Sequence, residues 1–144
     1  MPSVIHTGLT VRDLDASLGF YRDLLGMEVV MEQEKQGGYL AAIVGYEGAH
    51  VRMAHLSFPG DEQRIELFQY LEPPGRGDPA EPRDVGITHV CFLVEDLAGL
   101  AARLRGAGTA LYSDPVVVDT GANAGGLCLY LRDPDGITLE LFQR

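Results

Sequence analysis

Hydrophobic and polar residues alternate along several short segments of this chain, as they do in β-strands that have one covered face. The alternation is clearest over residues 4–11, 64–70, 87–94 and 137–143. Two other segments instead repeat hydrophobic residues every three or four positions, which indicates amphipathic helices. These helical stripes are Leu14, Leu18, Tyr21 and Leu25, and then Leu97, Leu100, Ala101 and Leu104.

Residues that start and stop helices flank both stripes. Asp13 and Asp96 precede them as N-caps, while Gly26 and the pair Gly106 and Gly108 suit the C-terminal ends. Further strands are expected at 28–34, at 39–57 with a possible break at 45–48, at 110–119 and at 126–132. The segment Asp-Pro-Asp-Gly at 133–136 predicts a tight turn between the last two strands.

The chain repeats itself. The segment that starts at Ile5 aligns with the one that starts at Thr88, so that His6 falls on His89, and each half ends in Glu-Leu-Phe-Gln. The proline-rich segment 71–86 between the halves reads as a linker. We therefore predict an α+β fold over a single domain, residues 1–144, with module one at 1–70 and module two at 87–144. The two βαβββ modules would form a curved mixed sheet around a cleft, with the helices outside.

Four chemically notable residues fall on the strand faces turned away from the helices. They are His6, Glu66, His89 and Glu140. A carboxylate on a half-buried strand is costly unless something compensates its charge. Two imidazoles and two carboxylates, brought together by the internal pseudo-symmetry, would suit Zn²⁺, Ni²⁺, Mn²⁺, Co²⁺ or Fe²⁺ better than Ca²⁺. The alternative is that each is an ordinary, satisfied strand residue.

Charge and composition narrow the classes of function. The chain has 144 residues and a formal net charge of −10, which argues against binding to nucleic acid or to an anionic membrane. No apolar run approaches the roughly 20 residues that span a bilayer, and no secretory leader is evident, so a cytoplasmic protein is expected. Cys91 and Cys128 lie in apolar runs and are predicted to be reduced core thiols.

The opening "IHTGLTVRDLDASLGFYRDLLGMEVV", the segment "THVCFLVEDL" and the closing "YLRDPDGITLELFQ" together resemble the vicinal oxygen chelate superfamily. That superfamily includes glyoxalase I, methylmalonyl-CoA epimerase, extradiol dioxygenases and bleomycin-binding proteins. The resemblance implies one divalent metal ion, with the four ligand positions falling on His6, Glu66, His89 and Glu140. The metal would be Zn, Ni, Mn or Co, or Fe in a dioxygenase.

A filled set of four ligands favours the glyoxalase and epimerase branch over extradiol dioxygenases, which use three. The resemblance then implies a lyase or isomerase that moves a proton at a carbon next to a metal-bound carbonyl. A metal-bound glutamate would be the base, with Glu140 ahead of Glu66 and the loop residue Glu47 as a separate acid/base candidate. An iron-dependent extradiol dioxygenase and a metal-free protein that binds a small molecule, such as an antibiotic, remain the alternatives.

The substrate expected from this resemblance is a small molecule with a carbonyl or vicinal oxygens, and the expected assembly is a homodimer. Four side chains are predicted to line its pocket: Phe68, Cys91, Tyr130 and Phe142. His50 and His55 are interpreted as surface or structural histidines, and Arg52 and Arg132 as solvated.

Overall fold

A computed structural model describes residues 1–78 and 80–144. The chain divides into two compact units, Met1–Gly77 and Asp78–Arg144, each of which has its own sheet and helix. Position 79, in the predicted linker, lies outside the described residues.

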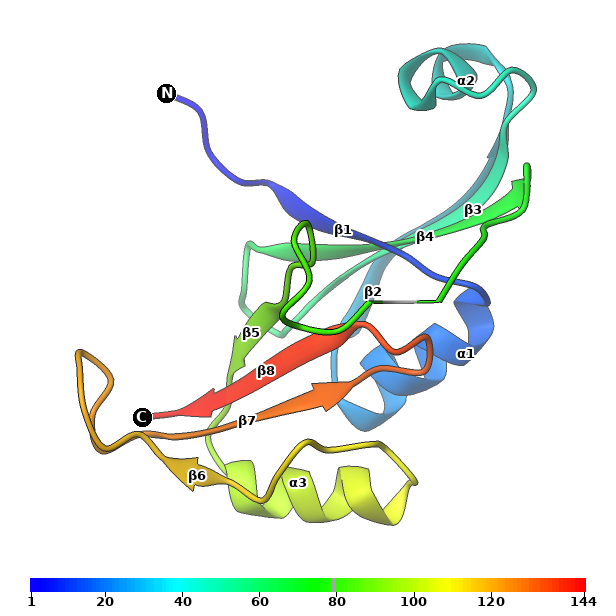
Figure 1. The fold of residues 1–144 in the computed structure, drawn as a ribbon. Coiled ribbons are helices and arrows are strands. Elements are labelled where there is room, and N and C mark those ends of the chain that lie inside the picture. Colours follow the sequence, from blue (N-terminus) through cyan, green and yellow to red (C-terminus); the bar gives the residue numbers. More distant parts are fainter. Residues whose placement is uncertain (79) are drawn as a thin grey trace. The chain divides into compact units, whose positions relative to one another are not determined.

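The first unit is a four-stranded mixed sheet with helices (Figure 1). Its strands lie in the order β1-β4-β3-β2, with β1 parallel to β4 and the other neighbours antiparallel. In chain order the elements are β1 (His6–Thr10), α1 (Leu14–Leu18), the π-helical continuation η1 (Gly19–Leu24), β2 (Glu28–Gln36), α2 (Gly38–Val44), β3 (His50–Ser57) and β4 (Arg64–Glu72).

The second unit repeats this plan. Its strands lie in the order β5-β8-β7-β6, and β5 again pairs in parallel with the last strand, β8. Its elements are β5 (Val90–Leu93), α3 (Leu97–Gly106), β6 (Val116–Val117), β7 (Leu127–Arg132) and β8 (Thr138–Gln143). The predicted α+β fold with two βαβββ modules is confirmed.

Both helical stripes are buried, as the hydrophobic spacing predicts. Asp13 caps α1 by accepting hydrogen bonds from the backbone N–H groups of Asp15 and Ala16, and Asp96 caps α3 through Gly99. Both predicted N-caps are therefore confirmed.

A glutamine from the last strand also binds the start of each helix. The side-chain oxygen of Gln69 accepts a hydrogen bond from the backbone N–H of Leu14 at 2.9 Å, and that of Gln143 accepts one from Leu97 at 2.8 Å. These N–H groups belong to the first turn and have no partner within the helix. The glutamine of each Glu-Leu-Phe-Gln segment thus fastens the helix to its sheet.

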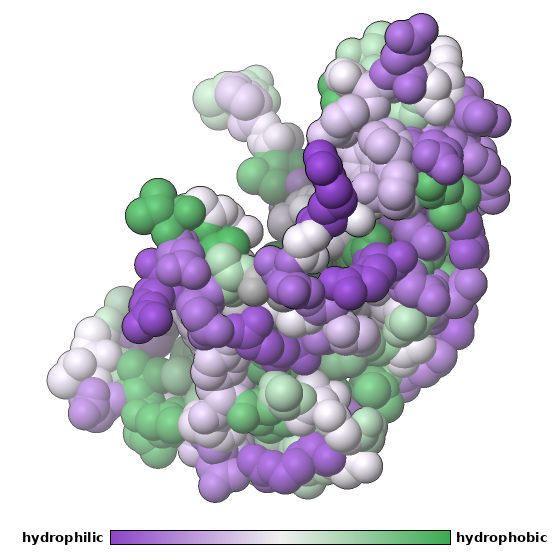
Figure 2. Space-filling model, turned by 45° about the vertical axis from the view of Figure 1, so that its right-hand side comes forward, coloured by the Kyte–Doolittle hydropathy of each residue, from purple (hydrophilic) through white to green (hydrophobic). Residues whose placement is uncertain are grey.

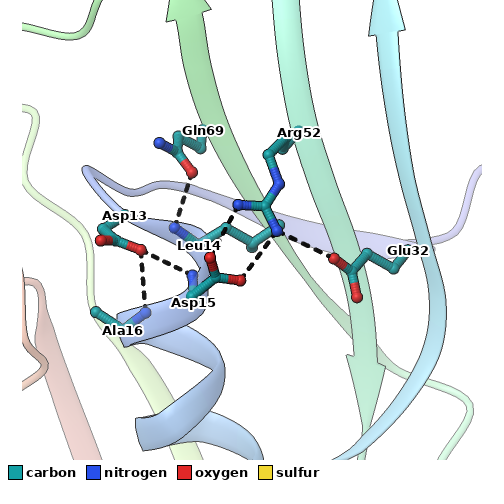
Figure 3. A network of polar contacts seen from close by, with 7 residues as sticks. All are labelled: Asp13, Leu14, Asp15, Ala16, Glu32, Arg52 and Gln69. Carbon is teal, nitrogen blue, oxygen red and sulfur yellow. Dashed lines mark hydrogen bonds and ion pairs between the residues drawn. The ribbon is translucent and has the colours of Figure 1, made fainter.

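Arg52 on β3 adds an ionic contact between α1 and the sheet (Figure 3). Its guanidinium donates to both carboxylate oxygens of Asp15, at 3.0 and 2.9 Å, and to Glu32 on β2 at 3.3 Å. The hydrogen bond from Arg52, followed by its positive charge, lowers the pKa of Asp15 below 3.8. The expectation that Arg52 is merely solvated is therefore wrong.

The predicted strand over residues 39–57 is wrong in its first part, because residues 38–44 form α2. Gly37 and Gly38 have positive φ angles that interrupt the strand, and Gly45 ends the helix in the left-handed region. Leu40, in the first turn of α2, packs on Val51 and Met53. Phe68 and Tyr70 lie against the same cluster. An apolar run this short fits the spacing of a strand and that of a helix equally well, and the packing of Leu40 decides in favour of the helix.

Other strands are shorter than predicted. The segment 110–119 contributes β6, at Val116–Val117, and an isolated bridge from Leu111 to Leu131. The first strand begins at His6, and Ile5, which was expected on the helix-packed face, is 70% exposed.

Hydrophobic as well as hydrophilic residues reach the surface on the face drawn in Figure 2. In the second unit the exposed hydrophobic residues include Leu93, Tyr112, Val116 and Val117. Within the described part of the chain, no helix has the length and apolar character needed to cross a membrane.

The glutamine contact in the second unit can be tested with Gln143→Leu. This change leaves the N–H of buried Leu97 without its acceptor, so the free energy of unfolding should fall by about 1–3 kcal/mol in urea denaturation. Gln143→Glu keeps an acceptor and adds a negative charge at the helix N-terminus, so it should retain most of the stability. Gln36→Leu, at an exposed strand position, is the matched control. Equal losses in Gln143→Leu and Gln143→Glu would contradict the capping role.

The Asp15–Arg52 pair makes a pH-dependent prediction. Because the folded-state pKa of Asp15 is lowered, the pair stabilises the fold above pH 3.8, and this contribution is lost as pH falls through the folded-state value. NMR titration of the Asp15 carboxyl should give a midpoint below 3.8 that rises in Arg52→Gln. The midpoint of Asp23, whose pKa is lowered by Arg22, should not move. An unchanged Asp15 midpoint would contradict the pairing.

Candidate functional site

The pairing of the outer strands places a histidine and a glutamate on one face of each sheet. In the first unit Gly8 on β1 lies beside Glu66 on β4, and His6 is two residues before Gly8, so the three share a face. In the second unit Cys91 on β5 lies beside Glu140 on β8. His89 precedes Cys91 by two residues and lies just before β5 begins.

In the first unit the imidazole of His6 approaches the carboxylate of Glu66, with 3.5 Å between Nε2 and Oε2. The Glu66 side chain is 18% exposed. Gly8 lies close to this carboxylate, since a Cβ there would be in van der Waals contact, 3.5 Å from Oε2 of Glu66. The pair is half-buried and faces away from α1, as the alternation predicts.

In the second unit the corresponding pair is closer, with 3.1 Å between Nε2 of His89 and Oε2 of Glu140. The hydroxyl of Tyr130 on β7 lies 3.1 Å from the same Nε2, and the rings of His89 and Tyr130 are 4.9 Å apart between centroids. Tyr130 is thus a direct neighbour of the predicted ligand pair.

His55 is a site residue that the sequence interpretation missed. On β3 it lies directly across from Glu66, and its Nε2 is 2.9 Å from Oε1 of that glutamate. Its ring lies 5.4 Å from that of His6. The alternation along β3 does indicate in the sequence that His55 shares a face with Met53. That Glu66 lies across from His55 could be known only from the register of β3 and β4. The other histidine set aside, His50, pairs with exposed Glu34 at 2.6 Å.

The structure therefore brings together His6 with Glu66, and His89 with Glu140. Each pair lies inside one unit. Among residues 1–78 and 80–144, no group of three or more His, Cys, Asp or Glu side chains is arranged to hold a metal ion. What each unit offers is one imidazole nitrogen and one carboxylate oxygen on the same face, which fits half of a His₂Glu₂ ligand set.

The predicted pocket residues lie on these same faces. Phe68 follows Glu66 by two positions and packs on Tyr70, with 5.1 Å between ring centroids. Phe142 follows Glu140 in the same way on β8, where its register partner is Leu93. An apolar side chain therefore lies beside each predicted ligand pair.

Cys91 and Tyr130 both carry a proton at neutral pH. Partial burial of the sulfur, then the charge of Glu140 and a hydrogen bond to it, raise the pKa of the Cys91 thiol to about 11. Burial, followed by the charge of Glu140, raises the pKa of Tyr130. Both cysteines are free, but Cys91 is exposed and Cys128 partly exposed, so the prediction of core thiols is wrong for their burial.

The expected alternative acid/base, Glu47, is exposed in the turn after α2.

Comparison with known proteins identifies the family. Residues 3–141 match the Glyoxalase/Bleomycin resistance protein/Dioxygenase superfamily. A 2-epi-5-epi-valiolone epimerase from an Actinomyces species is 30% identical over 96% of this chain and 78% of its own. A probable lactoylglutathione lyase from Vibrio parahaemolyticus is 28% identical over 97% of this chain and 89% of its own.

A solved structure agrees with this match. The crystal structure of a glyoxalase family protein from Bacillus cereus superimposes with a TM-score of 0.88 at 26% identity, covering 99% of this chain and 94% of that one. Since the family match extends over nearly the whole chain, this protein belongs to the Glyoxalase/Bleomycin resistance protein/Dioxygenase superfamily.

Proposed function

We propose that this protein is a divalent-metal-dependent lyase or isomerase that transfers a proton at a carbon next to a carbonyl. His6, Glu66, His89 and Glu140 would hold the metal ion, whether from one chain or from two. The observation that carries the proposal is the repeated pair, an imidazole Nε2 facing a glutamate Oε2 at 3.5 Å in one unit and 3.1 Å in the other. The relatives named as epimerase and lyase support this class of reaction.

The donor set matches a first-row divalent cation. Neutral imidazole and carboxylate suit Zn²⁺, Ni²⁺, Mn²⁺ and Co²⁺, and two carboxylates balance a charge of +2. When bound, such an ion polarises a carbonyl oxygen and stabilises the negative charge that develops there.

The carboxylates would carry the proton transfer. A glutamate beside the reacting carbon accepts the proton and returns it to the same carbon or to its neighbour. We assign this role to Glu140 first and to Glu66 second. The histidines would act as metal ligands only, and the Nε2 of each lies next to the carboxylate of the glutamate beside it.

The substrate would be a small molecule with a carbonyl or with two vicinal oxygens. Phe68 and Phe142 offer apolar surface next to the two ligand pairs, and the hydroxyl of Tyr130 and the thiol of Cys91 offer neutral hydrogen-bond donors. We also propose a homodimer, which light scattering after size-exclusion chromatography would test.

The metal site predicts a definite stoichiometry. Protein purified without a tag or chelator should hold about one Zn, Ni, Mn or Co ion per chain, measured by elemental analysis. Glu140→Gln and His6→Ala should lower this content, because each removes a ligand, whereas Glu95→Gln at an exposed position should not. Iron in place of these metals would favour an extradiol dioxygenase. Failure to bind any metal after reconstitution would favour a metal-free binding protein.

The proton transfer predicts isotope exchange. In D₂O, α-keto thiohemiacetals or acyl-CoA thioesters that serve as substrates should gain solvent deuterium at the carbon next to the carbonyl, observed by NMR or mass spectrometry. Chelation of the metal should stop the exchange, and Glu140→Gln should slow it by roughly 10²–10⁴-fold, the usual contribution of a general base. Consumption of O₂ with catechols, without such exchange, would contradict the proposal.

A further inference from the structure

The side chain of His55 holds Glu66 from the neighbouring strand. Strands β3 and β4 are antiparallel, and their register sets His55 directly opposite Glu66. The two side chains therefore project from the same face of the sheet. With 2.9 Å between Nε2 and Oε1, the contact is a hydrogen bond of good length.

Burial fixes which ring nitrogen of His55 carries the proton. The side chain is 15% exposed, and its Nδ1 is buried with no hydrogen-bond partner among the described residues. A proton on Nδ1 would be a buried donor without an acceptor, which costs more than an unused lone pair. Nε2 is therefore the ring nitrogen that donates to Oε1 of Glu66.

This hydrogen bond divides the two oxygens of Glu66 between two partners. Oε1 accepts from His55, while Oε2 is the oxygen that faces His6. Gly8 is the residue of β1 that lies beside Oε2. One oxygen is thus engaged and the other is directed toward the predicted ligand histidine.

In the second unit the corresponding cross-strand position is occupied differently. Tyr130 is the cross-strand neighbour of Glu140, just as His55 is of Glu66. Its hydroxyl, however, lies 3.1 Å from Nε2 of His89. Glu140 itself has the thiol of Cys91 as a neighbouring donor, and thiols donate weakly.

We propose that His55 is a positioning residue that fixes the Glu66 carboxylate through Oε1 and leaves Oε2 as the metal-binding oxygen. This inference rests on the proposed function and deepens it. Glu66 becomes the anchored ligand, whose rotation His55 restrains. Glu140, whose neighbour on β7 is Tyr130 with its hydroxyl at His89, becomes the carboxylate that can move to carry the proton.

The test compares two replacements of His55 in the full-length protein, with Co²⁺ as the probe. His55→Leu removes the donor, and Co²⁺ affinity, measured by competition with a chromogenic chelator, should fall by about 10–100-fold. The visible absorption spectrum of the bound Co²⁺ should change as well. His55→Gln can place an amide N–H where Nε2 lies, and it should recover most of the affinity. Met53→Leu, on the same face of β3, is the matched control.

A second measurement needs no metal. In the metal-free protein, ¹⁵N NMR should show the proton of His55 on Nε2, and the Glu66 carboxyl ¹³C signal should shift in His55→Leu but not in Met53→Leu. Circular dichroism and the thermal midpoint identify any variant that has failed to fold.

The outcomes separate the two proposals. If the wild type binds no Co²⁺, the proposed function fails and this role fails with it. If the wild type binds Co²⁺ but His55→Leu binds it equally well with the same spectrum, the role of His55 is overturned and the proposed function stands. If His55→Gln is as impaired as His55→Leu, hydrogen-bond donation is overturned in favour of His55 acting as a ligand itself.

Discussion

Each unit depends on the pleat of its last strand, which carries the segment Glu-Leu-Phe-Gln. Successive side chains of a strand point to opposite faces, so the four residues are divided between two tasks. The leucine enters the core and the glutamine binds the first turn of the helix, while the glutamate and phenylalanine face the other way. The same tetrapeptide therefore holds the helix and presents the carboxylate.

This division makes stability and site geometry inseparable. A slip of one residue in the pairing of β1 with β4 would move Glu66 to the helix side and leave the amide of Leu14 without its glutamine. The glutamine contact therefore also protects the register that sets Glu66 beside Gly8 and His6. The start of a helix more than 50 residues away in sequence therefore contributes to the placement of the Glu66 carboxylate.

The sequence predicted those parts of the fold in which a single period extends over enough residues. The duplicated strand-helix openings, both aspartate caps and the shared strand face of the histidines and glutamates follow from alternation and from the internal repeat. The helix at 38–44 could not be predicted, because its seven apolar or small residues fit a strand equally well and the burial of Leu40 decides. His55 was missed for a different reason. Its contact with Glu66 depends on which residue lies across the sheet, and the order of residues along β3 does not contain that information.

Two arginines on the sheets, Arg52 and Arg132, are engaged away from the site carboxylates. Arg52 is committed to Asp15 and Glu32 on the helix side of its sheet, and Arg132 to Glu81 and the carbonyl of Gly136. Glu66 and Glu140 are instead paired with imidazoles. Each imidazole gives its glutamate a hydrogen-bonding neighbour, and the proposed metal ion would add a full positive charge beside it. Two half-buried carboxylates of this kind favour a bound cation, and the histidine beside each supplies the nitrogen ligand that a first-row metal prefers to Ca²⁺.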